Sequence, residues 1–272
     1  MTRTVTEALA GLRVRRRGVP TAGRPVVVLV HGAMDRGASF GRVARRLDDF
    51  CVVAPDRRGY DGSSGAGPPV GLDGHLEDLC RVLDGLDGPS VVVGHSLGGT
   101  LALAVATLGR ADVVSVGAFE APVPWVDGTA SRVGGSALAV AAAEGPGAAA
   151  EHFYRSAVGD EVWARIGTTE RAARRAEGPA LVAELTDLRS GRAVFDVDRL
   201  RGGVHLAHGT VAPTVLADGM AALSGRSSGT LTVLEGAPHG AHLSHPDAYA
   251  GWIAGQVLAV TGPHGAVVGG PS

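Results

Sequence analysis

The 272-residue sequence contains no lysine, only two cysteines and few aromatic residues. All 25 basic residues are arginine, and the formal net charge of −2 gives no overall attraction to nucleic acid or to an anionic membrane. Cys51 and Cys80 are too few for a disulfide framework, so we expect two reduced thiols. No apolar run approaches the roughly 20 residues of a membrane span, and residues 1–17 lack the apolar core of a signal peptide. These absences favour a cytoplasmic protein without nucleic-acid or membrane partners.

What is present suits a globular α/β protein. Hydrophobic residues make up 45% of the chain and charged residues 19%, and the length fits one α/β domain with an inserted subdomain. Short valine-rich runs predict buried strands, and the helical spacing between them predicts a mainly parallel sheet with helices on both faces. The predicted strands are 26–30, 51–55, 90–94, 113–119, 203–207 and 231–234, and the predicted helices are 38–48, 72–86, 97–108 and 244–260.

Between residues 121 and 200 the alternation of strands and helices stops. This segment is rich in Ala, Glu and Arg with helical spacing, which predicts a helical cap inserted into the core. We therefore expect an α/β core formed by residues 1–120 and 201–260 and a cap over 121–200. The Gly/Pro-rich tail, 261–272, is predicted to be disordered.

The run Gly94-His95-Ser96-Leu97-Gly98 lies at a predicted strand-to-helix junction. A serine in such a tight turn takes a strained backbone conformation, and small residues two before and two after it keep neighbouring chain from colliding. The pentapeptide alone could be a chance match in a glycine-rich chain. The valine strand before it and the helix after it favour Ser96 as a nucleophile.

A tetrahedral intermediate needs two hydrogen-bond donors aimed at its oxygen. One is expected from the amide of Leu97, directly after the serine, where a helix N-terminus favours negative charge. The other is expected from the loop after the first buried strand, with the amide of Ala33 as the candidate and that of Gly32 as the alternative. His31, in the same loop, is expected to brace the loop through its ring nitrogens and not to act as a base.

Three histidines, His239, His242 and His245, lie in the loop after the last predicted strand. A serine hydroxyl needs an adjacent base, and His239 is the candidate because it comes first after that strand. His242 is the alternative, and His245, next to Pro246, is expected to begin a helix. A metal site formed by the three is disfavoured because no cysteine or carboxylate accompanies them at ligand spacing. No metal and no cofactor are expected.

Taken together, these motifs resemble the landmarks of the α/β-hydrolase superfamily in that family's order. They are His31-Gly32, the loop from Asp56 to Ser63, the run from Gly94 to Gly99, and His239 seven residues before Pro246. The resemblance covers most of the chain outside 121–200. It implies an α/β-hydrolase fold with an eight-stranded sheet, a Ser–acid–His triad and a cap over the site.

The acid departs from the usual pattern of that superfamily, which places an Asp after the next-to-last catalytic strand. The matching loop here, 208–213, has no carboxylate, and Asp218 comes a helical turn later. Another known position follows the strand after the nucleophile helix, where this chain has Glu120. We favour Glu120 over Asp218 because a triad needs one buried carboxylate to orient the imidazole. The alternative role for Glu120 is a salt bridge at the surface or at the hinge of the cap.

A Glu in this place is similar to the arrangement in haloalkane dehalogenases and in zearalenone-type lactone hydrolases. The dehalogenases use an Asp nucleophile, and Ser96 excludes their chemistry. The lactone hydrolases resemble this chain more closely, because they too combine a Ser nucleophile, a Glu in this place, a Thr-Pro loop lacking Asp, and a His followed by Ser-His-Pro-Asp. This resemblance implies a subfamily and does not assign a substrate.

The predicted cap concentrates aromatic residues in a chain that is only 4% aromatic: Trp125, Phe153, Tyr154 and Trp163. They can form the cap's own core or line an apolar pocket above Ser96. Trp125, close after Glu120, is the first pocket candidate, and Gly32, Met34 and Asp35 beside the oxyanion loop are others. An apolar pocket favours a hydrophobic, uncharged ester or lactone over a charged metabolite.

The sequence therefore predicts a serine hydrolase that cleaves an ester or lactone through an acyl-enzyme, acting as a monomer or homodimer on a small hydrophobic substrate. The same scaffold also hosts carbon–carbon bond hydrolases, thioesterases and lyases, which sequence alone does not separate. A non-catalytic ligand-binding protein and a cyclase or methylesterase of a natural-product pathway are further alternatives.

Overall fold

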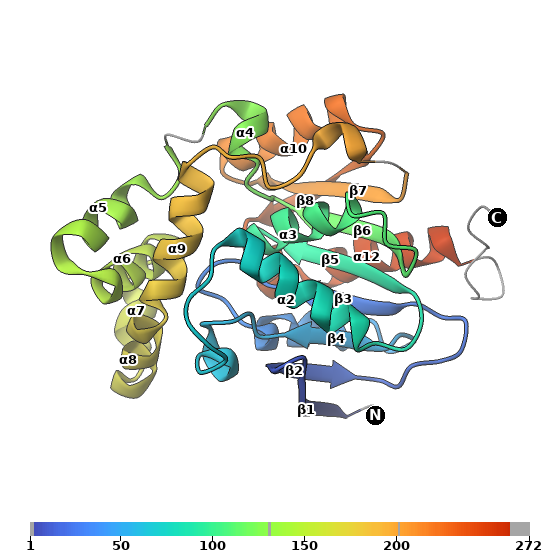
Figure 1. The fold of residues 1–272 in the computed structure, drawn as a ribbon, viewed down its shortest axis with the longest axis horizontal. Helices are drawn as coiled ribbons and strands as arrows, with labels where there is room; N and C mark the ends of the chain where they lie inside the picture. Colours follow the sequence, from blue (N-terminus) through green and yellow to red (C-terminus); the bar gives the residue numbers. More distant parts are fainter. Residues whose placement is uncertain (1–2, 130–131, 201, 262–272) are drawn as a thin grey trace.

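The computed structural model describes residues 3–129, 132–200 and 202–261, shown in Figure 1. Its strands form one eight-stranded sheet in the order β1-β2-β4-β3-β5-β6-β7-β8. The neighbours from β4 to β8 pair in parallel, and β1, β2 and β4 pair antiparallel. The strands are β1 (Thr4–Leu9), β2 (Leu12–Arg17), β3 (Val26–Val30), β4 (Val52–Pro55), β5 (Ser90–His95), β6 (Val113–Phe119), β7 (Val204–Val211) and β8 (Thr230–Pro238). The predicted fold class is confirmed.

Valine runs form the central strands because both faces of the sheet are covered. Along β3, Val27 and Leu29 belong to the apolar cluster on one face, and Val28 and Val30 belong to the cluster on the other. The first cluster includes residues of α1 (Gly41–Ala44) and α12 (Pro246–Val260), and the second includes residues of α2 (Leu72–Asp84) and α3 (Leu97–Ala106). In Figure 1, α2 lies in front of the sheet and α12 behind it.

Two local expectations differ from the structure. The hairpin β1–β2 is not predicted, because its second strand is rich in arginine. Leu12 and Val14 are nevertheless buried, while Arg13 between them is partly exposed. Ala10 and Gly11, between the strands, both have positive φ, as a two-residue hairpin turn requires. The helix expected over 38–48 is shorter: a 3₁₀ turn over Gly37–Phe40 leads into α1.

The segment between β6 and β7 is helical, and we call residues 121–200 the inserted segment. Its helices are α4 (Pro124–Asp127), α5 (Gly135–Glu144), α6 (Pro146–Val158), α7 (Asp160–Arg165), α8 (Thr168–Ala176) and α9 (Gly178–Arg189). Figure 1 shows α5 to α9 grouped at the left end of the sheet. The chain then returns to the sheet through β7, α10 (Thr214–Arg226), β8 and α11 (Ala241–Ser244).

A buried ion pair ties α9 of the inserted segment to the core. The carboxylate of Glu184 is fully buried, accepts hydrogen bonds from Arg57 (2.5 Å) and the Tyr60 hydroxyl (2.7 Å), and lies 2.8 Å from Nε2 of His75. Arg57 and Tyr60 follow β4, and His75 belongs to α2. Burial by itself would raise the pKa of Glu184, but Arg57 and His75 lower it to about 2. The carboxylate is therefore ionised at neutral pH.

Two further expectations concern the C-terminal tail and membrane-spanning helices. The predicted disordered tail, 261–272, lies outside the described residues except for Thr261, which is buried and whose hydroxyl donates to the carbonyl of Val257. Within the described ranges, no helix combines the length and the apolarity that crossing a membrane would need.

Candidate active site

Ser96 lies between β5 and α3 in a strained turn. Its backbone has φ 54° and ψ −127°, and its N–H donates to the carbonyl of Phe119 on the neighbouring strand β6 (2.9 Å). A Cβ on Gly94 would lie 2.0 Å from the carbonyl oxygen of Gly98, and a Cβ on Gly98 would lie 2.1 Å from that of Val30. Only glycine fits at both positions, which is the steric reason for the spacing predicted from the sequence.

Glu120 and His239 meet at the carboxyl ends of neighbouring strands. Glu120 directly follows β6, His239 directly follows β8, and the Glu120 Oε2 atom lies 2.6 Å from Nδ1 of His239. The other carboxylate oxygen accepts the N–H of Gly209 (2.9 Å), and the side chain of Glu120 is fully buried. With its Nδ1 proton donated to the carboxylate, the imidazole keeps its Nε2 lone pair free to act as a base.

Glu120 lies beside β7 and the loop 208–213, where the usual acid is expected from the sequence. Because β6 and β7 pair in parallel, its N–H donates to the carbonyl of Ala207 on β7, just before the loop 208–213 that lacks a carboxylate. Glu120 also has a positive φ of 47°, which few non-glycine residues adopt. Asp218, the alternative acid, lies exposed on α10. The structure therefore brings Glu120, and not Asp218, to the imidazole.

The predicted oxyanion residues lie beside the serine. Ala33 and Leu97 both line the cavity that Ser96 and His239 line. Gly32 packs directly against the nucleophile, because a Cβ there would lie 2.9 Å from the Cβ of Ser96. The loop after β3 thus packs directly against the serine, which is where a second oxyanion donor is expected.

His31 braces this loop through its two ring nitrogens and is not among the residues that line the cavity. Its Nδ1 donates to the carbonyl of Gly32 (2.7 Å), and its Nε2 accepts the backbone N–H of Arg57 (2.9 Å). Burial, followed by the charge of Arg57, lowers the pKa of His31 to about 4. A neutral, fully buried ring with both nitrogens engaged fits the bracing role.

The remaining histidines near the serine have separate partners. His95 Nε2 donates to the carbonyl of His239 (2.7 Å), and burial, with the neighbouring imidazoles, holds its pKa well below the usual value. His242, the alternative base, is buried and lies 3.2 Å from the carboxylate of Asp35. Burial would raise the pKa of Asp35, but the bond from His242 and the nearby imidazoles hold it below its usual range. His245 precedes α12 at its N-cap, as expected of a residue that begins a helix.

The cavity over Ser96 has a volume of about 290 Å³ and mainly apolar walls. From the inserted segment Phe153, Leu185 and Leu188 line it, and from the start of α10 Val215 and Leu216 do. Among the described residues that line it, Asp127 and Arg132 are the charged ones. Such a site suits an uncharged acyl group next to the serine.

Of the aromatic residues expected around the pocket, Phe153 lines the cavity and the others pack elsewhere. Trp163 is buried against Tyr154 within the inserted segment, with ring centroids 5.7 Å apart, and Arg174 lies over the Tyr154 ring. Trp125 packs edge-on against Phe195 (5.2 Å). The same correction applies to two residues of the oxyanion loop: Met34 is buried in an apolar cluster with the inserted segment, and Gly32 lies under Ser96.

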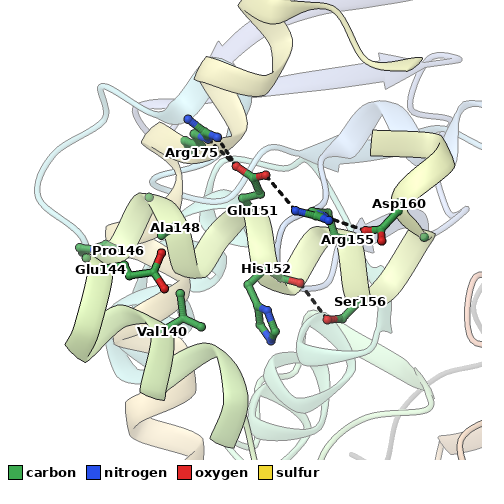
Figure 2. Close-up of a pocket in the computed structure, with 13 residues that line it drawn as sticks. Val140, Glu144, Pro146, Ala148, Glu151, His152, Arg155, Ser156, Asp160 and Arg175 are labelled. Carbon is green, nitrogen blue, oxygen red and sulfur yellow. Dashed lines mark hydrogen bonds and ion pairs between the residues drawn. The ribbon is translucent and has the colours of Figure 1, made fainter. Parts of the chain in front are cut away.

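A second, larger hollow of about 1120 Å³ crosses the surface of α5 and α6 (Figure 2). Its charged side chains are largely paired with one another: Glu151 bonds both Arg155 and Arg175, and Arg155 also bonds Asp160 (2.7 Å). These ion pairs engage the charges of four of the side chains that line the hollow, Glu151, Arg155, Asp160 and Arg175. The chemistry-bearing residues predicted from the sequence converge on the smaller cavity instead.

The region that contains this site matches a known protein family. The model of the alpha/beta hydrolase family matches residues 27–252. The chain belongs to this family. The match includes Ser96, Glu120 and His239, and the family resemblance inferred from the motifs is confirmed at this level.

Individual relatives match only part of this chain or have low sequence identity to it. The chain is 35% identical over 122 residues to the lipase LipV of Mycobacterium tuberculosis, a match that spans 44% of this chain and 45% of the lipase. It thus covers less than half the length of that relative. Among solved structures, it is similar to a thermophilic esterase from Thermogutta terrifontis (TM-score 0.68, 20% identity, 94% of this chain and 98% of that chain). It is also similar to an enol-lactonase from Burkholderia xenovorans (TM-score 0.67, 18% identity, 93% and 99%). At these identities the similarity to the two structures shows a shared fold.

Proposed function

We propose that this alpha/beta hydrolase is a serine hydrolase that cleaves an ester or lactone of a hydrophobic substrate through a Ser-His-Glu triad. The observation that carries the proposal is the 2.6 Å contact between the buried carboxylate of Glu120 and Nδ1 of His239, which shares a cavity with Ser96. A buried carboxylate that orients an imidazole next to a strained serine is the arrangement that nucleophilic acyl transfer needs.

The reaction would proceed in two steps. His239 takes the proton of the Ser96 hydroxyl as its Oγ attacks the substrate carbonyl, and the amides of Ala33 and Leu97 hold the oxyanion. The imidazolium then protonates the leaving alcohol, which yields an acyl-enzyme. In the second step His239 activates water, whose attack releases the acid and restores Ser96. Glu120 orients the ring of His239 throughout and stabilises the imidazolium.

The proposed substrate class follows from the walls of the cavity. Its volume of about 290 Å³ and its mainly apolar lining accommodate a compact apolar acyl group. We propose that the inserted segment acts as a cap, because Phe153 and Leu185 contribute to these walls. The relatives described as a lipase, an esterase and an enol-lactonase support ester or lactone chemistry. The position of Glu120 resembles the arrangement expected in zearalenone-type lactone hydrolases, which favours including macrolactones among the candidates.

The proposal is tested with a panel of p-nitrophenyl esters and macrolactones, assayed with the wild type and the Ser96→Ala variant. We expect Ser96→Ala to lower kcat by about 10⁴-fold or more while the fold is retained, because the nucleophile is lost. Ser156→Ala, on the exposed face of α6, is the matched control and should keep full activity.

A fluorophosphonate probe provides a second readout that needs no knowledge of the substrate. Labelling of the wild type at Ser96, with no labelling of Ser96→Ala, supports an activated serine. Turnover retained by Ser96→Ala would contradict the mechanism. Failure of the probe to label Ser96 would instead favour a ligand-binding protein on this scaffold.

A further inference from the structure

Behind the catalytic histidine, three metal-ligating side chains converge from separate parts of the chain. Asp35 follows β3, His95 ends β5, and His242 belongs to α11. One ring nitrogen of each histidine and one carboxylate oxygen lie within 4.8 Å of one another. The two histidines are buried, with ring centroids 4.2 Å apart, while the side chain of Asp35 is 22% exposed. The cluster is therefore closed on the protein side and reached from solvent past Asp35.

The hydrogen bonds of His95 leave one nitrogen without a role in the fold. Its Nε2 donates to the carbonyl of His239, so Nδ1 carries the lone pair. Nδ1 is buried and has no hydrogen-bond partner among the residues that the structure describes. Metal-ligating histidines usually donate their other ring N–H to a backbone carbonyl or a carboxylate, which is the bond that His95 already makes. Leaving a buried ring nitrogen unsatisfied otherwise costs free energy.

The other two ligands are already spaced as a metal would hold them. Asp35 Oδ2 and Nε2 of His242 are 3.2 Å apart in a hydrogen bond. Metal binding replaces this bond, and the ring proton of His242 then lies on Nδ1. Two ligands of a tetrahedral ion at about 2.1 Å are separated by about 3.4 Å. The ligand nitrogen of His95 lies within 4.8 Å of both, so an adjustment of its side-chain torsions completes the set. The hydroxyl of Ser39 donates to the same oxygen of Asp35 (2.9 Å) and holds the carboxylate in place.

We propose that Asp35, His95 and His242 bind a divalent transition-metal ion such as Zn²⁺. Two neutral imidazoles and one carboxylate form a donor set that suits Zn²⁺ and its neighbours in the first transition row, whereas Ca²⁺ and Mg²⁺ prefer oxygen ligands alone. The partly exposed side of Asp35 leaves the fourth position to water. This site is independent of the proposed hydrolase activity.

The ion would hold together the loops that build the catalytic site. Asp35 belongs to the oxyanion loop, His95 directly precedes Ser96, and His242 lies three residues after His239. His95 also contacts the catalytic ring, with centroids 4.7 Å apart. Because the ligands come from three segments distant in sequence, binding stabilises the folded chain over the unfolded one. The inferred role is structural, and no step of ester cleavage uses the metal.

The test measures metal binding directly. Protein freed of metal with a chelator is titrated with Zn²⁺ by calorimetry and with Co²⁺ by visible absorption, and its Tm is recorded with and without Zn²⁺. We expect one ion per chain, absorption bands typical of four-coordinate Co²⁺ that Zn²⁺ displaces, and a Tm raised by Zn²⁺. Asp35→Asn and His242→Gln should each weaken Zn²⁺ binding by more than about tenfold, since each removes a ligand.

Controls separate this site from other histidines. His152→Gln, on α6, should bind Zn²⁺ like the wild type, and His239→Gln should retain the Co²⁺ bands. Asp35→Asn keeps the shape of the side chain and an acceptor for Ser39, so its circular dichroism shows whether lost binding has a local cause. The proposal is overturned if the wild type binds no metal, if both ligand variants bind like the wild type, or if His239→Gln alone abolishes binding.

Discussion

Two residues at the site, Ser96 and Glu120, hold backbone conformations that few non-glycine residues adopt. Their φ angles are 54° and 47°, and each directly follows a central strand. Such strain costs of order 1–3 kcal/mol per residue and persists where the surroundings enforce it. For Ser96 the surroundings are the two glycines that admit the turn; for Glu120 they are the bonds to Gly209 and His239. Both conformations direct a functional side chain toward the cavity region.

The choice of acid can be tested by comparing Glu120→Gln with Asp218→Asn. We expect Glu120→Gln to lower kcat for a p-nitrophenyl ester by about 10³–10⁴-fold, because a neutral amide neither stabilises the imidazolium nor selects its tautomer. Asp218→Asn is the matched control, since it makes the same change on the exposed face of α10, and its kcat should stay within about twofold of the wild type. A greater loss in the Asp218 variant would refute the assignment.

At the scale of elements, α9 joins the inserted segment to the core through a buried ion pair. Glu184 places a fully buried carboxylate between Arg57, Tyr60 and His75, which belong to the core. A buried ion pair of this kind contributes little net stability compared with apolar packing, yet breaking it is costly because the remaining charge stays buried. The pair therefore fixes where α9 lies. Since Leu185 and Leu188 of the same helix line the cavity, it also fixes one wall of the proposed substrate pocket.

We predict that Glu184→Gln lowers the free energy of unfolding by about 3–5 kcal/mol, because Arg57 then remains buried without a counter-charge. Urea denaturation measures the change, and hydrogen exchange shows whether protection is lost first in α9. Glu161→Gln, on the exposed surface of α7, is the control and should change stability by less than about 0.5 kcal/mol. Equal stability of the two variants would show that the pair does not hold α9.

At the scale of the whole molecule, the fold buries two histidines, His31 and His75, in surroundings that lower their pKa. His31 lies under the oxyanion loop, and burial lowers its pKa to about 4. His75, in α2, also has a lowered pKa, mainly through burial and then through the charge of Arg57. In the unfolded chain both rings would take up a proton near pH 6.5. The folded and unfolded states therefore differ in bound protons below neutral pH.

This difference predicts that stability falls as the pH is lowered from about 6.5 toward 4. In that window the unfolded chain binds more protons than the folded one, so acid favours unfolding; for His31 alone the full effect is roughly 3 kcal/mol. Below pH 4.5 the loss continues, because the pKa of Glu184 is lowered to about 2 and its contribution disappears as it is protonated. Calorimetry in metal-free buffer should show Tm decreasing from pH 7 to pH 5. A constant or rising Tm over that range would contradict the prediction.

Much of this molecule follows from local sequence. Valine runs bounded by turns predict the central strands, because residues buried on both faces must be apolar whatever their partners. Ser96 is recognisable because its turn admits only small residues on either side, and the position of Glu120 after an apolar strand indicates a buried acid. The hairpin β1–β2 escapes prediction because arginines dominate β2 and its burial alternates only briefly.

Local sequence sets the order of the strands and helices and the residue types at the strand ends. Which of these ends meet depends on the packing of the whole chain. Parallel pairing of β6 with β7 sets Glu120 beside Gly209, and the return of the chain after β8 brings His239 to that carboxylate. Likewise, Trp125 and Trp163 pack away from the cavity. Asp35, His95 and His242 converge, although Asp35 and His242 are 207 residues apart in the sequence. Spacing along the chain encodes local geometry, whereas contacts between distant segments depend on how the whole core packs.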